Sequence, residues 1–339
     1  MKTAVFAYSR KGIRTARRVI SLSGDAEAAL FVPERLAAEN AGIILRPSQV
    51  FYGERFRQAE ALIFIGACGI AVRAIAPHVQ SKVTDPAVLC IDELGQYVIP
   101  LLSGHIGGAN ELAKRLAAGL GAQAVITTAT DINRRFSVDT WAVQNGFLIT
   151  DLSRAKEISA AILEEDVPFS SMLPVADELP AGLIFRDHGP LGIFVTWEKR
   201  EPYEKTLRLV PKVLHLGIGC RKGTDSAAIS TAVSRTLSKY DLDPAAVKCA
   251  ASIDLKADEP GLLEYCRAAR LPVTFFSAEE LMAVEGEFHA SDFVREITGA
   301  DNICERAAMI GAHQLIVPKT VFDGVTVAAA AEMKEVRFE

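Results

Sequence analysis

Residues 61–73 read ALIFIGACGIAVR, an apolar run that turns through two glycines and ends on an arginine. The first five residues are typical of a buried strand, and the residues after Gly66 are typical of a helix. A strand that passes through a glycine turn into a helix is the repeating unit of α/β proteins. Short apolar runs alternate with helical patterns along most of the chain, which predicts a mainly parallel sheet flanked by helices.

Composition and charge narrow the class of protein further. Of the 339 residues 50% are hydrophobic and 23% are charged, so the chain can bury substantial cores and is not disordered. The length predicts two or three domains. The net charge of −5 argues against a nucleic-acid or membrane-surface binder. Apolar runs too short for a signal peptide or a bilayer span predict a soluble, cytoplasmic protein.

The six cysteines are scattered along the chain. None belongs to a C-x-x-C pair, and none is spaced with a histidine as zinc ligands are. We therefore expect neither a metal site nor disulfides, and the free thiols suit a reducing cytosol.

The predicted fold class is α/β. Residues 1–145 and 212–339 are each expected to form a three-layer α/β/α domain with a mostly parallel or mixed sheet. Residues 146–211, which six prolines interrupt, are expected to form a small α+β middle domain. The expected strands are 3–8, 28–32, 61–65, 87–91, 97–102, 124–128, 183–185, 193–197, 213–218, 250–255, 273–276, 315–317 and 325–329. The expected helices are 13–21, 70–76, 109–120, 152–163, 226–238, 262–269, 292–297 and 303–311, and the turn at 92–95 predicts a hairpin.

The segment richest in chemistry is residues 102–111, LSGHIGGANE. His105 stands just ahead of a predicted helix, where it is suited to transfer a proton near neutral pH. As an alternative, Ser103 or His105 caps the helix and Glu111 is a favourable charge at its N-terminus. Three glycines around one histidine exceed what a cap requires, so we favour a functional loop.

Two further loops of the first domain follow apolar strands. The turn at 66–73 offers glycines and a helix N-terminus to an anion, and Arg73 is placed on the first helical turn. Tight packing around a buried Cys68 is the alternative. Residues 127–133, TTATDIN, could bind a polar ligand or cap the next helix, and alone they favour capping.

A fourth loop, residues 217–224, reads GIGCRKGT. It fits neither the Walker A motif nor the G-x-G-x-x-G fingerprint. Arg221, Lys222 and the backbone N–H groups are suited to a carboxylate or phosphate. All four loops follow strands, so we expect them at the carboxyl edges of their sheets, where α/β proteins bind ligands. Lys319 is expected at the same edge as Arg221.

Together these segments resemble the cobalt-precorrin-5A hydrolase (CbiG) family of anaerobic cobalamin biosynthesis. The resemblance rests on residues 66–73, 99–113, 127–131, 217–224, 252–259 and 317–320, which occur in the family's order. It covers nearly the whole chain and is weakest over 145–210. One departure is Arg306, which stands where the family pattern has a smaller residue or proline.

The resemblance implies a hydrolase acting on a carbon–carbon bond of a cobalt-corrinoid. Water opens a δ-lactone between the ring A acetate and C20, and C20 then leaves with its methyl group as acetaldehyde, giving cobalt-precorrin-5B. The substrate carries the cobalt, so no cofactor of the protein is implied.

For this chemistry we predict His105 as the base that activates water or deprotonates the C20 alcohol, with Glu111 or Asp131 orienting it. The N–H groups of Gly107 and Gly108 are candidate oxyanion donors. Basic residues are expected to bind the substrate's carboxylates. The predicted substrate-binding residues are Gly66, Cys68, Gly69, Arg73, Ser103, Gly104, Gly107, Gly108, Asn110, Thr128, Gly219, Arg221, Lys222, Thr224 and Lys319.

Two other functions stay open from the residues themselves. One is a nucleotide-dependent α/β enzyme, which would need a complete glycine fingerprint. The other is a non-catalytic corrinoid-binding protein, in which His105 only caps a helix. The expected partner is a cobalt-corrinoid small molecule. A homodimer and transient contacts with neighbouring enzymes of the pathway are compatible with the sequence.

Overall fold

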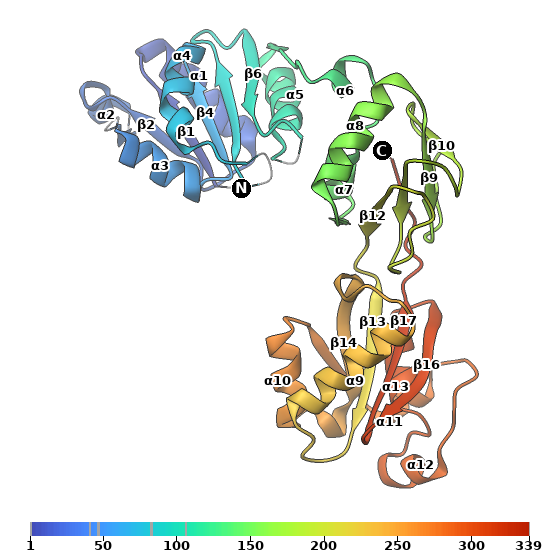
Figure 1. Ribbon diagram of the computed structural model, residues 1–339. Coiled ribbons are helices and arrows are strands. Elements are labelled where there is room, and N and C mark those ends of the chain that lie inside the picture. The colour runs from blue at the N-terminus through green and yellow to red at the C-terminus, as the bar shows by residue number, and fades with distance from the viewer. Residues whose placement is uncertain (1, 41, 46–47, 82–83, 106, 339) are drawn as a thin grey trace. The chain divides into compact units, whose positions relative to one another are not determined.

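The computed structural model describes residues 2–40, 42–45, 48–81, 84–105 and 107–338 (Figure 1). Residues 102–111, which include His105, are called the histidine loop below, and Ile106 within it lies outside the described residues. The chain forms two compact units, Met1–Thr140 (unit 1) and Trp141–Glu339 (unit 2). None of the helices in these described ranges is long and apolar enough to cross a membrane.

Unit 1 is built on one mixed sheet with the strand order β3-β2-β1-β4-β5-β6-β7. The first five strands in this order are parallel, β6 runs antiparallel to β5, and β7 is parallel to β6. The predicted hairpin therefore reverses the chain inside the sheet. The strands are β1 Thr3–Ala7, β2 Ala29–Val32, β3 Ile43–Ile44, β4 Ala61–Ile65, β5 Ala87–Ile91, β6 Tyr97–Leu102 and β7 Gln123–Ala124.

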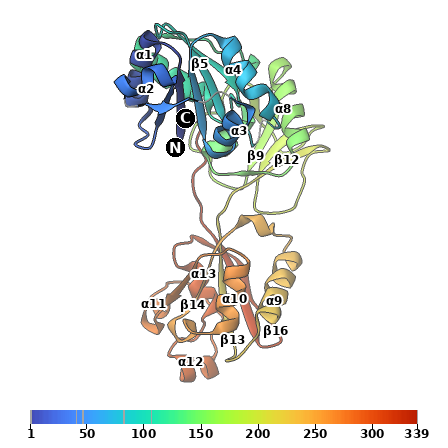
Figure 2. The same cartoon turned by 90° about the vertical axis from the view of Figure 1, so that its left-hand side faces the viewer.

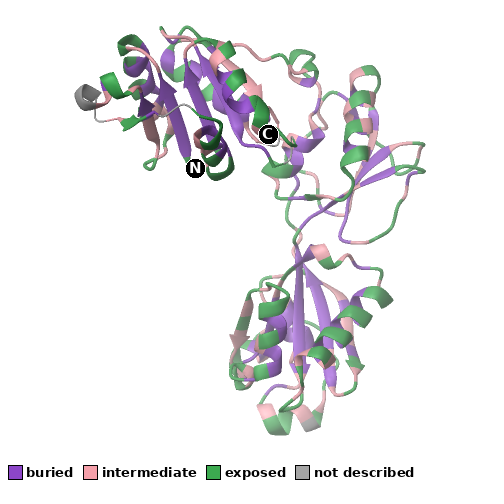
Figure 3. Ribbon diagram, turned by 60° about the vertical axis from the view of Figure 1, so that its left-hand side comes forward, coloured by how far each residue is buried: buried purple, intermediate pink, exposed green. Residues whose placement is uncertain are grey.

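Helices cover both faces of this sheet because its central strands are apolar on both sides. Val5 and Ile63 pack with α1 and α5 on one face, whereas Phe6 and Phe64 pack with α3 and α4 on the other. The sheet is the most buried layer of the unit (Figure 3). The helices are α1 Arg10–Ser23, α2 Glu34–Asn40, α3 Gln49–Gln58, α4 Cys68–Ile75, η1 Ala76–His78, α5 Ala109–Leu120 and α6 Ala129–Ile132, and α7 Val138–Gln144 begins at the end of the unit.

The first sheet of unit 2 has the order β10-β9-β11-β12-β8. The end of the chain returns to it: Val336 bridges Val175, and the Phe338 ring stacks on Trp141 at 4.8 Å between centroids. Residues at the C-terminus thus complete the core of the middle region. The elements are α8 Leu152–Glu164, β8 Leu148–Ile149, β9 Val167–Ser171, β10 Leu183–Phe185, β11 Gly192–Val195 and β12 Thr206–Val210.

The second sheet of unit 2 has the order β15-β14-β13-β17-β16, in which β17 alone runs antiparallel to both of its neighbours, β13 and β16 (Figure 2). The helices α9 and α10 pack on one another, and α13 packs on β13 and β17. The strands are β13 Leu214–Cys220, β14 Val247–Ile253, β15 Val273–Phe276, β16 Gln314–Phe322 and β17 Val325–Ala331. The helices are α9 Ser226–Lys239, η2 Pro244–Ala246, η3 Asp254–Lys256, α10 Pro260–Ala268, α11 Ala278–Met282, α12 Asp292–Thr298 and α13 Cys304–Met309.

The predicted α/β class is confirmed, with several local corrections. The expected strand 124–128 ends at Ala124, and the expected strand 315–317 continues to Phe322, so Lys319 lies within β16 and not in a loop after it. The patterns missed several elements, namely α2, α3, α6, α11, β3, β8, β9 and β12. The structure contains the three expected sheets, and the division into three domains stays a prediction. Arg306 fits its position because its guanidinium donates to Asp301 and to two backbone carbonyls.

Candidate active site

The Gly66 loop, residues 66–73, and the histidine loop were expected at the same edge of the sheet. They lie at opposite edges. Gly66 follows β4 at the end where Ile65 pairs with Ile91. The histidine loop follows β6, whose last residue Leu102 pairs with Val88 at the start of β5. The hairpin therefore carries the histidine loop to the amino edge of β4 and β5. The shared-edge prediction for Gly66, Cys68, Gly69 and Arg73 was wrong, and Arg73 lies in the last turn of α4, not the first.

Close backbone approach explains the glycines of the histidine loop. A methyl group on Gly107 would come within 2.4 Å of the Ser103 Cβ, and one on Gly104 within 2.8 Å of the Asn110 side chain. Ser103 is buried, adopts a positive φ of 56° and donates to the Asp85 carbonyl oxygen at 2.9 Å. Gly108, not a polar side chain, occupies the N-cap of α5. Its N–H donates to the His105 carbonyl oxygen, so this predicted oxyanion donor is engaged within the loop.

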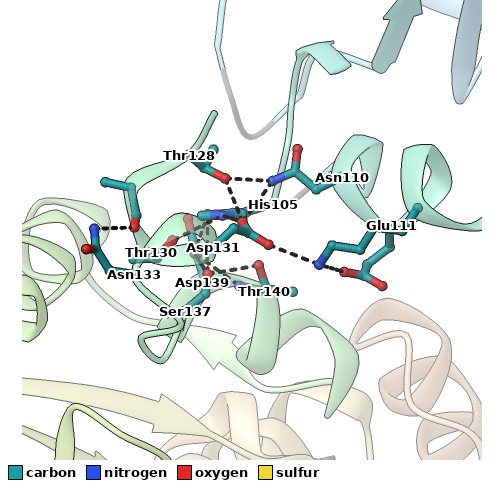
Figure 4. A network of polar contacts seen from close by, with 12 residues as sticks. His105, Asn110, Glu111, Thr128, Thr130, Asp131, Asn133, Ser137, Asp139 and Thr140 are labelled. Atoms are coloured by element: carbon teal, nitrogen blue, oxygen red, sulfur yellow. Dashed lines mark hydrogen bonds and ion pairs between the residues drawn. The ribbon is translucent and has the colours of Figure 1, made fainter. Parts of the chain in front are cut away.

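His105 lies between two carboxylates (Figure 4). Its Nε2 atom is 3.1 Å from Asp131 Oδ2, and its Nδ1 atom is 3.3 Å from Asp139 Oδ1. The Ser137 hydroxyl donates to the same Asp139 oxygen at 2.9 Å. Because both ring nitrogens face carboxylate oxygens, the arrangement favours the imidazolium form, which donates from both. The hydrogen bond to Asp139 raises the pKa of His105, and this effect with that of Asp131 outweighs the opposing effect of burial.

Asp131 is the centre of a second set of contacts. Its Oδ2 atom accepts from the Thr128 hydroxyl at 2.6 Å and from Asn110 Nδ2 at 3.0 Å, and its Oδ1 atom accepts from Lys114 Nζ at 3.0 Å. Burial raises the pKa of Asp131, but the hydrogen bonds outweigh burial and lower it to about 2. Asp131 is therefore ionised at neutral pH and is a poor proton acceptor.

Most of these groups line one pocket of about 270 Å³, namely His105, Asn110, Lys114, Asp131 and Ser137, whereas Thr128 and Asp139 are not among its lining residues. Glu111 lines it too but bonds Lys114 at 2.8 Å instead of His105. Arg134 and Arg135 add positive charge, and Arg134 adopts a positive φ of 51°, a backbone conformation that is uncommon for a bulky residue and concentrates at functional sites. The pocket thus combines a histidine whose pKa is raised, one carboxylate outside the histidine's contacts, and cations for an anionic ligand.

The predicted residues that line this pocket are Gly104, His105, Asn110, Glu111 and Asp131, and the predicted Thr128 bonds Asp131 without lining it. Sequence reasoning missed other residues that hold His105 and Asp131 in place. Asp139 and Ser137, in the segment that begins α7, hold the second ring nitrogen of His105. Lys114, one helical turn after Asn110, holds Asp131. The sequence carries only a weak signal for Asp139, Ser137 and Lys114. Each is a charged or hydroxyl residue within ten positions of a predicted functional segment.

The predicted residues of unit 2 lie at a different pocket. Gly219, Arg221, Lys222 and Lys319 line a pocket of about 490 Å³ at the ends of β13 and β14. Thr224 does not line it; its hydroxyl donates to the Arg221 carbonyl oxygen at 2.8 Å. A second contact holds the loop at residues 217–224, because the Gly223 N–H donates to the buried Glu259 carboxylate at 2.7 Å.

A histidine held between carboxylates in a small polar pocket of an α/β unit is typical of one class of protein. This class is the enzymes that work by proton transfer. Comparison with known proteins gives the particular family. The family models for the N-terminal and C-terminal parts of cobalamin synthesis protein G match residues 51–131 and 214–330. The chain belongs to this family, that of the cobalt-precorrin-5A hydrolases, and the predicted resemblance is confirmed.

Two relatives match almost end to end. The cobalt-precorrin-5A hydrolase of Salmonella typhimurium is 36% identical over 96% of each chain. That of Priestia megaterium is 31% identical over 96% of this chain and 94% of its own. Among solved structures, a cobalamin biosynthesis protein G homologue from Sulfolobus solfataricus is 20% identical over 97% of each chain, with a TM-score of 0.43.

Proposed function

We propose that this protein opens the lactone of cobalt-precorrin-5A in the His105 pocket and releases acetaldehyde, leaving cobalt-precorrin-5B. Family membership supports the reaction. The observation that carries the choice of pocket is His105, whose two ring nitrogens lie 3.1 and 3.3 Å from Asp131 and Asp139. A proton donor held in this way suits the departure of an alkoxide.

The first step is hydrolysis of the lactone. Water attacks the acyl carbon, and Glu111, the lining carboxylate that does not bond His105, takes the water proton. Arg134 and Lys114 stabilise the developing oxyanion and the new ring A carboxylate. The acyl–oxygen bond breaks, and the His105 imidazolium gives its proton to the departing C20 oxygen. This order replaces the predicted role of His105 as the group that activates water.

The second step uses the neutral His105 that the first step leaves. It takes the proton of the C20 hydroxyl, whose O–H electron pair becomes the second bond of the carbonyl. The bond between C20 and the macrocycle breaks, and its electron pair stays on the macrocycle. Acetaldehyde departs and His105 is again in the imidazolium form. The proton on Glu111 and the proton of the new ring A carboxyl pass to solvent, which restores the starting state of the pocket. The macrocycle with its cobalt is the electron acceptor, so the step uses no cofactor of the protein.

We also propose a cytoplasmic setting in which the corrinoid passes between this enzyme and its pathway neighbours. The free thiols support a reducing compartment. The substrate itself supplies the cobalt, so the residues of the pocket need only bind, orient and transfer protons.

The test is anaerobic incubation of the purified chain with cobalt-precorrin-5A while acetaldehyde is trapped. His105→Ala is expected to lower its release by roughly a hundredfold or more. The matched control is His188→Ala, the same change at a histidine whose side chain is 80% exposed, and it should leave release unchanged. Equal release from His105→Ala would place catalysis elsewhere. No release from wild type, with the substrate verified independently, would leave a non-catalytic corrinoid-binding protein.

A further inference from the structure

Unit 2 contains a larger pocket than the one around His105. This Lys319 pocket, of about 490 Å³ against about 270 Å³, lies where the loop after β13 meets the end of β14, β16 and α12. Its lining includes Arg221, Ile253, Ile297 and Lys319. The reaction proposed above takes place in unit 1 and leaves this pocket without a role.

The charged side chains that line the Lys319 pocket are all basic. Arg221, Lys222, Lys256 and Lys319 line it, and its described lining residues include no aspartate, glutamate or histidine. Lys256 bonds Glu259 at 2.9 Å, whereas no carboxylate in the described ranges forms an ion pair with the other three. Three of the four cations thus have no ion-pair partner in the described ranges, and in a chain of net charge −5 this indicates a ligand with several negative groups.

The wall between these cations is apolar. Ile253, Val294 and Ile303 form part of it, and Leu255 and Ile297 are each 63% exposed. Exposed apolar side chains of this size next to a pocket mark a surface that a ligand covers. Inorganic phosphate or a bare carboxylate would satisfy the cations but leave this wall in water.

Two thiols also line the pocket and indicate binding without chemistry. Burial raises the pKa of Cys304 to about 11 and also raises that of Cys220. Both thiols are therefore protonated at neutral pH and are weak nucleophiles. No other lining residue in the described ranges is an acid or base suited to proton transfer near pH 7.

We propose that the Lys319 pocket is a binding site for an apolar macrocycle that carries several carboxylates, with Arg221, Lys222 and Lys319 on the carboxylates and Leu255 and Ile297 against the ring. Naming a corrinoid as the ligand rests on the proposed function. The pocket would hold substrate or product independently of the histidine that acts on the lactone. Amphipathic contact of this kind combines apolar burial with charge-assisted hydrogen bonds.

The experiment measures binding to the full chain by the visible spectrum of a stable corrinoid. The probe is dicyanocobyrinic acid, which has free carboxylates, and its heptamethyl ester has the same ring without the charges. The double variant Arg221→Ala with Lys319→Ala should weaken binding of the acid by roughly tenfold or more. Lys212→Ala, which removes an exposed lysine outside the pocket, should leave it unchanged. The ester should bind wild type weakly.

A second variant guards against a folding effect. Leu255→Asp changes an exposed side chain and adds an anion to the pocket, so it should also weaken binding while circular dichroism stays that of wild type. The proposal is overturned if the acid binds all variants equally, if acid and ester bind alike, or if ATP binds and the acid does not. Binding of the acid is also measured on His105→Ala. It should equal binding to wild type, because the proposed site holds its ligand independently of that histidine. If binding depends on Arg221 and Lys319 while wild type releases no acetaldehyde, this site stands and the proposed reaction falls.

Discussion

Replacing Asp139 with asparagine is expected to slow acetaldehyde release by roughly 10- to 100-fold at neutral pH. Asparagine keeps the size of the side chain and removes the charge 3.3 Å from His105 Nδ1. The Asp139 side chain is only 8% exposed, so solvent screens this contact little. A hydrogen bond to a charged group contributes about 1.5 to 3 kcal/mol. Each loss of about 1.4 kcal/mol slows a reaction tenfold, which gives the stated range if the contact persists in the transition state.

The pH dependence of kcat/KM tests which way His105 transfers its proton. The hydrogen bond to Asp139 raises the pKa of His105, so the variant lowers that pKa. If His105 donates a proton first, activity falls as His105 deprotonates, and the alkaline limb of the profile moves to lower pH in the variant. If His105 were instead the initial base, the acidic limb would move to lower pH and relative activity below neutrality would rise.

Ser137→Ala is the matched control because it keeps the Asp139 charge and removes only a neutral hydroxyl, which lies 2.9 Å from Asp139 Oδ1 and 3.3 Å from His105 Nδ1. We expect a smaller loss and a limb that stays in place. The reasoning is refuted if Asp139→Asn lowers kcat but leaves both limbs where wild type has them. Asp139 would then support only the packing of α7, and His105 would not titrate in the measured range.

Two further predictions concern stability. The pKa of Asp131 is lowered from 3.8 to about 2, so its contribution of about 2 kcal/mol is present above pH 4 and is lost as pH falls towards 2. Asp131→Asn should flatten that part of the acid-unfolding curve followed by circular dichroism, and an unchanged curve would contradict the contacts assigned to Asp131. Gly217→Ala would place a methyl group 1.7 Å from the Cys304 carbonyl oxygen and should destabilise unit 2 by about 3 kcal/mol in urea. Gly223→Ala, where a methyl group meets nothing within 4 Å, should cost only about 1 kcal/mol for its positive φ, and equal losses would refute the close-approach argument.

The alternation of apolar runs and helices was enough to predict most of both large sheets, because buried parallel strands are apolar on both faces. Short elements such as β8 and β12 were missed because tertiary pairing, not local pattern, makes them strands. The same limit applies to the site. His105 and Asp131 stood in segments with clear signals, whereas Asp139 stands in an ordinary helix start and gains its role only through the fold.

The hairpin shows why a correct local prediction can still misplace a site. The turn at 92–95 was read as a hairpin from its sequence, and β6 does run antiparallel to β5. Each reversal of a strand exchanges the edge at which its following loop emerges, so the histidine loop had to lie opposite the Gly66 loop. The hairpin turn and the two loops are all local features of the sequence, so this relation follows from the sequence alone.

Arg73 and the Gly66 loop lie at the edge of the sheet opposite His105, so they are not part of the pocket in which we place the reaction. The Gly66 N–H donates to the Ile91 carbonyl oxygen at 2.8 Å, and the Cys90 thiol donates to the Gly66 carbonyl oxygen at 3.2 Å. These bonds tie the turn to β5, so within unit 1 its glycines serve the join between strand and helix. The cations beside His105 are instead Lys114 and Arg134, which come from α5 and from the segment after α6. Contacts between the ring A end of the substrate and unit 1 should therefore be sought first at these two residues.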